Sequence, residues 1–220
     1  MRLVCVSDTH GLHAHVQPPD GDVLVHAGDW SRRGELPELR AFDAWLGTLP
    51  HRHKIVIAGN HDFCFEEQPA AARAMLTHAT YLQDSGCEID GVRFWGSPWQ
   101  PWFFDWAFNL RRGAPLRAKW ALIPDGTHVL VTHGPPHGVL DVTARGEPVG
   151  CEELTLAVDR VRPRLHVFGH IHEAFGTLAR GGTLFVNASF ADLRYRPANR
   201  AVVVDVDEGG ARLTAGPVLS

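Results

Sequence analysis

The chain has 220 residues, enough for one domain with a sizeable core, and we predict a single domain over residues 1–220. Its apolar fraction of 45% and charged fraction of 21% are ordinary for a globular protein. Its 21 basic and 25 acidic residues leave a formal net charge of -4, which argues against a protein that coats DNA or RNA, because such proteins need a basic surface. We therefore expect no general nucleic-acid partner.

The first residues enter a strand-like apolar run directly, without a signal-peptide pattern, and no apolar run is long enough to cross a membrane. The spacing of the four cysteines, Cys5, Cys64, Cys87 and Cys151, matches neither a zinc site nor a disulfide framework. We expect a cytoplasmic protein with reduced thiols and no membrane partner. Coiled-coil heptads are missing from the sequence, so it predicts no oligomeric state.

In the first half of the chain, the apolar runs 3–6, 23–25 and 54–58 predict buried strands. Each run ends at polar residues. Between the second and third runs, apolar residues recur at spacings of three and four, which predicts an amphipathic helix over 36–49 with Pro37 in its first turn. The order is therefore strand, strand, helix, strand.

The second half mixes hairpins with further strand and helix patterns. An Asp-Gly turn predicts a hairpin over 88–94, and a Gly-Gly turn predicts another over 175–186. The remaining predicted elements are strands at 129–132, 165–168 and 201–206 and a helix at 154–161. This mixture predicts an α/β fold of two packed mixed sheets with helices outside.

Five short motifs carry the candidate chemistry, and most of them follow one of the apolar runs. In chain order they are Asp8-Thr9-His10, Gly28-Asp29, Gly59-Asn60-His61-Asp62, Thr132-His133-Gly134 and Gly169-His170-Ile171-His172. They supply carboxylate, amide and imidazole ligands. Such mixed oxygen and nitrogen ligands suit Mn, Fe, Zn or Mg rather than a thiolate site.

The ligand types predict two metal ions that share one carboxylate. Asp29 can bridge both ions, so that each ion has four protein ligands and keeps open positions for water and substrate. Two ions about 3.5–4 Å apart can clamp a phosphate and lower the pKa of bound water to about 7, which yields a hydroxide nucleophile. His61 follows the ligand Asn60 and is the candidate proton donor, and we expect Asp62 to orient its imidazole.

The ordered motif set resembles the calcineurin-like metallophosphoesterase superfamily, and more closely its metallophosphodiesterase-domain subfamily. The segments that carry the resemblance are Ser7-Asp8-Thr9-His10-Gly11, His26-Ala27-Gly28-Asp29, Ile55-Val56-Ile57-Ala58-Gly59-Asn60-His61, Gly96-Ser97-Pro98-Trp99-Gln100-Pro101, Thr132-His133-Gly134-Pro135-Pro136 and Phe168-Gly169-His170-Ile171-His172-Glu173. Together they span most of the chain, from about residue 3 to about residue 206.

The resemblance implies an αββα four-layer sandwich of two mixed sheets and a binuclear site, with Mn favoured over Fe, Zn or Mg. It assigns one ion to Asp8, His10, Asp29 and His172, and the other to Asp29, Asn60, His133 and His170. It also implies that His61 is the catalytic histidine. Every ligand of the family set is present here.

Four further side chains are candidates for substrate binding. Trp99 and Trp102 lie in an aromatic segment that either stacks against a nucleobase or packs as a structural lid. Arg32 and Arg33 follow Asp29 closely and either contact a phosphate or lie on the surface.

We therefore predict a phosphodiesterase for small phosphodiesters, with cyclic nucleotides as one candidate class. The diester preference comes from the subfamily resemblance, because the site chemistry serves monoesters equally well. The alternatives are a phosphomonoesterase, such as a nucleotidase or protein phosphatase, a nuclease, which the acidic balance disfavours, and a non-catalytic metal-binding scaffold.

Overall fold

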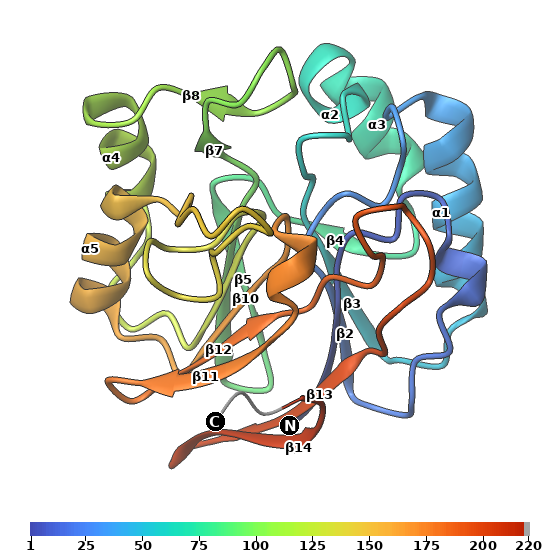
Figure 1. Cartoon of the computed structure of the whole chain (residues 1–220). Coiled ribbons are helices and arrows are strands. Elements are labelled where there is room, and N and C mark those ends of the chain that lie inside the picture. The colour runs from blue at the N-terminus through green and yellow to red at the C-terminus, as the bar shows by residue number, and fades with distance from the viewer. Residues whose placement is uncertain (218–220) are drawn as a thin grey trace.

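The computed structural model describes residues 1–217, and within them two six-stranded mixed sheets pack face to face (Figure 1). The first sheet has the order β14 (Gly210–Ala215), β13 (Val202–Asp207), β1 (Arg2–Val6), β2 (Val23–His26), β3 (His53–Val56), β4 (Thr80–Tyr81). The second has the order β11 (Gly176–Arg180), β12 (Thr183–Asn187), β10 (Leu165–Phe168), β9 (Val129–Thr132), β6 (Val92–Ser97), β5 (Ser85–Ile89). A small ribbon pairs β7 (Gln100–Pro101) with β8 (Asn109–Leu110).

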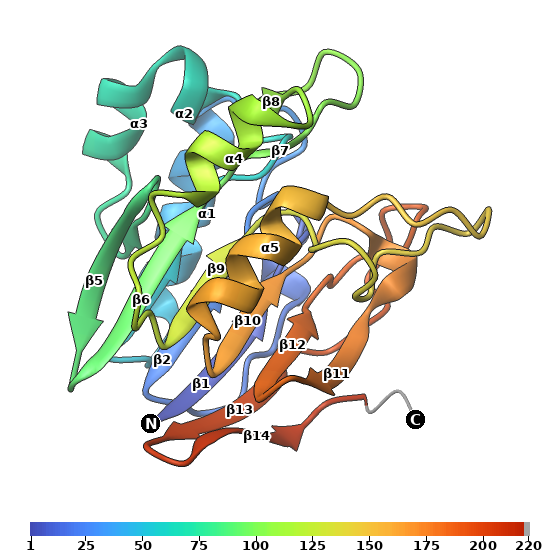
Figure 2. The same cartoon turned by 90° about the vertical axis from the view of Figure 1, so that its left-hand side faces the viewer.

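Helices cover the outer faces of both sheets. The first sheet carries α1 (Leu36–Thr48), α2 (Cys64–Glu67) and α3 (Pro69–Met75), and the second carries α4 (Ala114–Trp120) and α5 (Glu152–Val161) (Figure 2). Two short 3-10 turns, η1 (His13–His15) and η2 (His172–Ala174), complete the described elements. The expected αββα four-layer sandwich is confirmed.

Alternating side chains of β1 show why the sheets are buried on both faces. Leu3 and Cys5 point into the core between the two sheets, whereas Val4 and Val6 pack with the apolar stripe of α1. A third apolar cluster joins the second sheet to α4 and α5. The short apolar runs of the sequence are therefore strands with no solvent-facing side.

The central strands run parallel, which brings their carboxyl ends to one edge of the sandwich. β1, β2 and β3 are parallel neighbours in the first sheet, as are β9 and β10 in the second. A bridge between Ser7 and Ser189 links the two sheets where these strands end. The polar motifs follow these ends, as is usual for functional residues in α/β folds.

The structure adds elements that the sequence pattern did not predict. β14 follows the strand that we expected to be last; it is an edge strand that pairs with β13 alone, and none of its residues is fully buried. α2, α3 and α4 are short, so the helical period has little length in which to show.

Candidate metal centre

The structure brings all seven predicted ligands together at the carboxyl edge of the two sheets. Loops after β1, β2 and β3 carry the ligands of the first sheet, and loops after β9 and β10 carry those of the second. The side chains form three groups, and within each group the potential ligand atoms lie within 4.8 Å of one another. The groups are Asp8, His10 and His172; His10, Asp29 and His61; and Asp29, His133 and His170. Asp29 belongs to two of these groups, as a bridging carboxylate would.

Four of these residues have a backbone conformation that most side chains avoid. The φ angles of Asp8, His10, Asp29 and His170 are 53°, 43°, 54° and 68°. Left-handed conformations at non-glycine residues cost free energy and cluster at functional sites. Here they turn each side chain sharply out of its strand toward the shared centre.

Two glycines make room for the carboxylates. A Cβ on Gly59 would lie 2.2 Å from Asp29 Oδ1, and a Cβ on Gly169 would lie 2.0 Å from Asp8 Oδ2. Neither contact is sterically allowed, so only glycine permits this approach of the backbone. The Gly-Asn and Gly-His steps of the motifs therefore have a direct steric reason.

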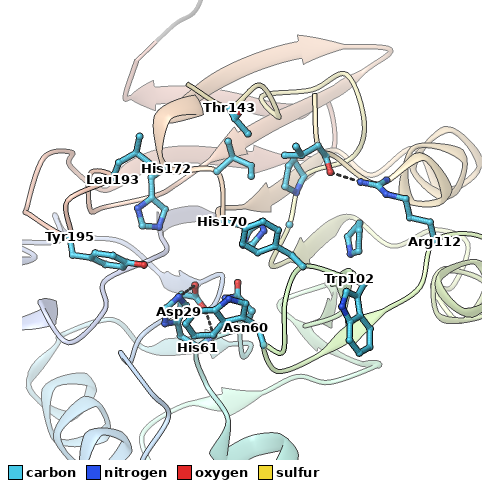
Figure 3. Close-up of a pocket in the computed structure, with 17 residues that line it drawn as sticks. Asp29, Asn60, His61, Trp102, Arg112, Thr143, His170, His172, Leu193 and Tyr195 are labelled. Atoms are coloured by element: carbon cyan, nitrogen blue, oxygen red, sulfur yellow. Dashed lines mark hydrogen bonds and ion pairs between the residues drawn. The ribbon is translucent and has the colours of Figure 1, made fainter. Parts of the chain in front are cut away.

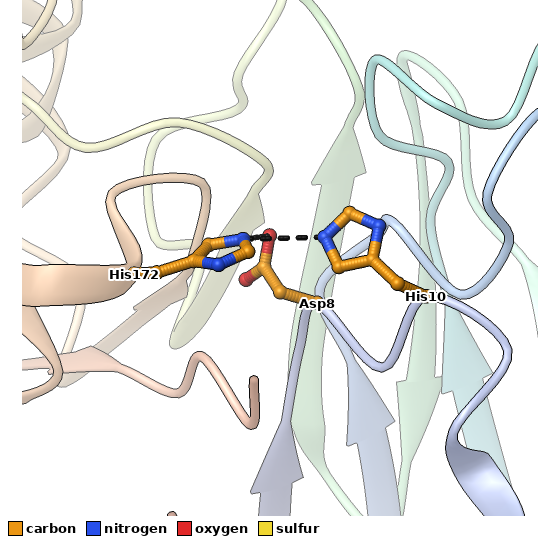
Figure 4. A group of neighbouring side chains, drawn as sticks. All are labelled: Asp8, His10 and His172. Carbon is orange, nitrogen blue, oxygen red and sulfur yellow. Dashed lines mark hydrogen bonds and ion pairs between the residues drawn. The ribbon is translucent and has the colours of Figure 1, made fainter. Parts of the chain in front are cut away.

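Backbone carbonyl groups orient the imidazoles. Nδ1 of His10 donates to Ser31 O (3.2 Å), that of His133 to Ala27 O (3.0 Å) and that of His172 to Asp192 O (3.1 Å). A carbonyl oxygen can only accept, so Nδ1 carries the proton and Nε2 of each neutral ring presents a lone pair to the centre. Figure 4 shows His10 and His172 converging beside Asp8.

These lone pairs meet other acceptors at short range. Nε2 of His10 lies 3.2 Å from Nε2 of His172, and Nε2 of His133 lies 2.9 Å from Asn60 Oδ1. Two acceptors at this distance repel each other unless a proton or a cation lies between them. The donor set therefore fits metal ions at both ends of the centre.

The pKa shifts of the buried histidines also fit a centre that binds divalent cations. Burial lowers the pKa of His10 to about 4 and that of His170 to about 3, so both rings are neutral near pH 7, the form that binds metals. Burial opposes protonation of His133 and His172, yet the buried carboxylates of Asp29 and Asp8 raise the pKa of each ring to about 9. The centre thus holds negative charge that attracts protons, and a divalent cation would displace them.

The structure corrects the expected role of Asp62. Its carboxylate accepts hydrogen bonds from the backbone N–H groups of Asp29 (2.8 Å), Gly59 (2.8 Å) and Ser31 (3.1 Å) and from Ser31 Oγ (2.7 Å). It is fully buried. Asp62 therefore joins the loops after β2 and β3 and positions Asp29.

A backbone group orients His61 instead. Nδ1 of His61 donates to the carbonyl oxygen of Arg32 at 2.8 Å, and Nε2 lies 4.0 Å from Asp29 Oδ2. Trp106 packs over the ring with centroids 4.1 Å apart. His61 thus presents Nε2 to the centre without being needed as one of the seven ligands.

A cavity of about 430 Å³ opens in front of the centre. Asp29, Asn60, His61, His170 and His172 form its base. Apolar and aromatic side chains dominate its walls, namely Pro101, Trp102, Phe103, Trp106, Pro135, Val149, Ile171, Leu193 and Tyr195 (Figure 3). Arg112 and Thr143 supply polar groups at the rim.

Of the four predicted substrate residues, one lines this cavity and three do not. Trp102 lines it, whereas Trp99 packs elsewhere: its Nε1 donates to Asp84 at 2.9 Å and Lys119 lies over its ring. Arg33 is exposed and is tied to α1 through its backbone, which donates to Glu38. Arg32 lines a separate cleft beside His61.

Sequence reasoning missed the specific roles of Trp106 and Tyr195. Tyr195 has a φ of 55° and packs edge-on against His10 with ring centroids 4.7 Å apart. It comes from the loop before β13, where no motif marks it. Trp106 belongs to the aromatic segment that the sequence singled out, but nothing in the spacing distinguishes it from Trp99.

The model of the calcineurin-like phosphoesterase family matches residues 1–174. This chain belongs to that family. Human metallophosphoesterase domain-containing protein 1 is 47% identical to it over 230 residues, an alignment that covers 93% of this chain and 71% of the human protein. The resemblance predicted from the motifs is thereby confirmed. The family comprises divalent-metal-dependent hydrolases of phosphoesters, and the clustered histidines and aspartates fit that class.

Solved structures share the fold at low sequence identity. TT1561 of Thermus thermophilus is 15% identical, with a TM-score of 0.62, and the match covers 96% of this chain and 97% of that one. A structure described as a novel archaeal phosphodiesterase is also 15% identical, with a TM-score of 0.50, and the match covers 97% of this chain and 98% of that one. Among residues 1–217, we find no helix whose length and apolar character would let it cross a membrane.

Proposed function

We propose that this chain is a metal-dependent phosphodiesterase that acts on small phosphodiesters. The observation that carries the proposal is the apolar cavity in front of the metal centre. Among its lining residues, Arg112 is the one permanent cation, and its guanidinium already donates to Gly150 O (2.7 Å), Val149 O (2.7 Å) and the carboxylate of Glu152.

This wall favours a diester over a monoester. A monoester phosphate is largely dianionic at neutral pH, and its extra charge needs cationic or donor partners beyond the ions. A diester carries one negative charge and a second ester group, which the walls formed by Trp102, Phe103 and Leu193 can cover. The archaeal phosphodiesterase contributes only the fold to this argument.

Seven residues would hold two divalent ions, with Mn as our favoured metal. Asp8, His10 and His172 would bind one ion, Asn60, His133 and His170 the other, and Asp29 both. When bound, such ions polarise the phosphate and supply a hydroxide nucleophile at neutral pH.

His61 would then act as the proton donor. The Arg32 carbonyl holds Nδ1, so the Nε2 atom is the one directed at the reacting ester. Protonated there, His61 can give its proton to the leaving oxygen and so avoid release of an alkoxide. Trp106, whose ring packs against the imidazole at a tilt of 35°, supports that orientation.

We further propose a small-molecule substrate and a cytoplasmic location. Cys5, Cys64, Cys87 and Cys151 are all free thiols in the described part of the chain, which supports a reducing compartment.

Steady-state hydrolysis of bis(4-nitrophenyl) phosphate and 4-nitrophenyl phosphate by the Mn-loaded protein tests the proposal. We expect a higher kcat/KM for the diester, loss of turnover on chelation, and a fall in kcat of about 10²-fold or more in His61→Ala. His15→Ala is the matched control, because His15 is exposed on η1. Preference for the monoester would identify a phosphomonoesterase, and unchanged turnover in His61→Ala would remove His61 from the chemistry.

A further inference from the structure

A second cleft lies beside His61, separate from the apolar cavity. Its volume is about 380 Å³, and its lining residues are Arg32, His61, Arg194 and Tyr195. His61 and Tyr195 line both spaces. The proton donor therefore lies at the junction of an apolar cavity and a basic cleft. In Figure 3, Tyr195 lies on one side of Asp29 and His61, and Trp102 and Arg112 lie on the other.

The two arginines of the cleft are available for an anion. Among residues 1–217 neither guanidinium forms an ion pair with a carboxylate, and Arg32 Nε donates only to His10 O at 3.2 Å. The nearby carboxylate of Asp192 forms its ion pair with Arg196 (2.6 Å). From Arg194 it accepts a hydrogen bond of the backbone N–H (2.8 Å) and none of the guanidinium. The cleft therefore carries two uncompensated positive charges.

The backbone holds these cations at a defined place. The Arg32 carbonyl accepts the His61 Nδ1–H, so the first cation comes from the residue that orients the proton donor. Tyr195, with its left-handed φ of 55°, follows Arg194 directly and packs edge-on against His10. Arg32 thus comes from a loop of the metal centre, and Arg194 directly precedes a residue that packs against that centre.

We propose that this cleft is a subsite for a phosphate group carried by the leaving group of the substrate. The inference rests on the proposed function, because His61 protonates the leaving oxygen and the leaving group must therefore lie on the His61 side. Arginine forks bind phosphate oxygens in pairs of charge-assisted hydrogen bonds. The substrate class is a phosphodiester with an apolar or aromatic ester group in the cavity and a second phosphate in the cleft.

Thymidylyl-thymidine, without and with a terminal phosphate at either end, tests this subsite. Chromatography of the products identifies the leaving nucleoside. The dinucleotide whose terminal phosphate lies on that nucleoside should be cleaved with a kcat/KM at least about tenfold higher than that of the parent, whereas the other isomer should show no such gain. That ratio should fall toward one in Arg194→Gln and in Arg32→Gln. The Arg32 substitution retains the carbonyl that holds His61. Arg212→Gln, on the exposed edge strand β14, should keep the wild-type ratio.

Equilibrium binding separates failure of the subsite from failure of the phosphodiesterase proposal. Calorimetry on the metal-loaded protein should show thymidine 3',5'-bisphosphate binding about tenfold more tightly than thymidine 5'-monophosphate, with the difference lost in Arg194→Gln. If no diester is cleaved but this binding preference is found, the phosphodiesterase proposal fails and the subsite stands. Equal binding of the two nucleotides, or a preference that survives both arginine substitutions, would overturn the subsite.

Discussion

Trp106 packs over the imidazole of His61 with ring centroids 4.1 Å apart and planes inclined at 35°. On its Nδ1 side, the same imidazole donates to the Arg32 carbonyl at 2.8 Å. The stacking surface and the hydrogen bond leave Nε2 as the one ring nitrogen that faces the metal centre. The aromatic segment before β8 therefore contributes to the orientation of His61 as well as to the cavity wall.

We predict that Trp106→Ala lowers kcat by roughly tenfold to a hundredfold, because a small displacement of a reacting group is costly. Trp106→Phe retains a stacking surface and should restore most of the activity. Metal content should be the same in all three proteins, since Trp106 is not one of the seven candidate ligands. Equal kcat values for the wild type and Trp106→Ala would show that the stacking does not position His61.

Asp62 allows a second prediction. In Asp62→Asn, an amide NH2 would face backbone donors that the carboxylate now satisfies, so at least one hydrogen bond would be replaced by a repulsive contact. We expect metal affinity to fall about 10- to 100-fold, as is usual when a partner of a metal ligand is lost. Competition with a fluorescent chelator measures this, with the exposed Asp159→Asn on α5 as control. Unaltered affinity would mean that Asp62 does not position Asp29.

The sequence pattern predicted an α/β fold of two mixed sheets, because strands buried on both faces leave continuous apolar runs and α1 is long enough to show its period. The four-layer sandwich followed from the family resemblance. The ligands could be predicted from the ordered motifs. The hydrogen-bond partners of Asp62 could not be predicted. Asp62 is adjacent to His61 in sequence, but its carboxylate binds backbone N–H groups of the loop after β2. Tyr195 lies far from every motif, and only the fold brings it to His10. Trp99 and Trp106 look alike in sequence, and the path of the β7–β8 ribbon decides which one reaches the site.

Removal of the metal should destabilise the protein, because chelation removes the binding free energy of the ions and leaves only histidine protons to balance the buried Asp8 and Asp29 carboxylates. For each ion present at about 100 times its Kd, the loss of binding free energy is about 2.7 kcal/mol, or roughly 5–10 °C in Tm per ion for a chain of this size. Thermal unfolding with and without chelator measures the shift. The double variant His133→Ala/His170→Ala should show a smaller decrease in Tm on chelation. An identical Tm in both conditions would contradict a metal-stabilised centre.

Asp43 gives a pH-dependent contribution to stability away from the active site. Burial favours its neutral form, but hydrogen bonds from the backbone and ring of His78 and from Thr77 outweigh burial and hold the pKa of the carboxyl below its usual value. A depressed pKa stabilises the fold above the unfolded-state pKa of about 3.9, and this contribution is lost as the pH falls through the folded-state pKa.

We therefore predict that Asp43→Asn lowers the free energy of unfolding by about 1–3 kcal/mol at pH 7. The difference from the wild type should shrink as the pH is lowered below about 4. Urea unfolding of both proteins between pH 7 and pH 3 provides the comparison. A difference that stays constant over this range would show that the Asp43 charge does not contribute to stability.

We propose that seven residues hold two metal ions and that the hydrolysis of a diester requires both. Elemental analysis of the purified, Mn-loaded protein, with turnover of bis(4-nitrophenyl) phosphate measured on the same samples, tests it most directly. We predict two ions per chain in the wild type and fewer than two in His172→Ala and in His133→Ala, with diester turnover falling in step. One ion or none in an active wild-type enzyme, or turnover that persists after complete chelation, would contradict the account.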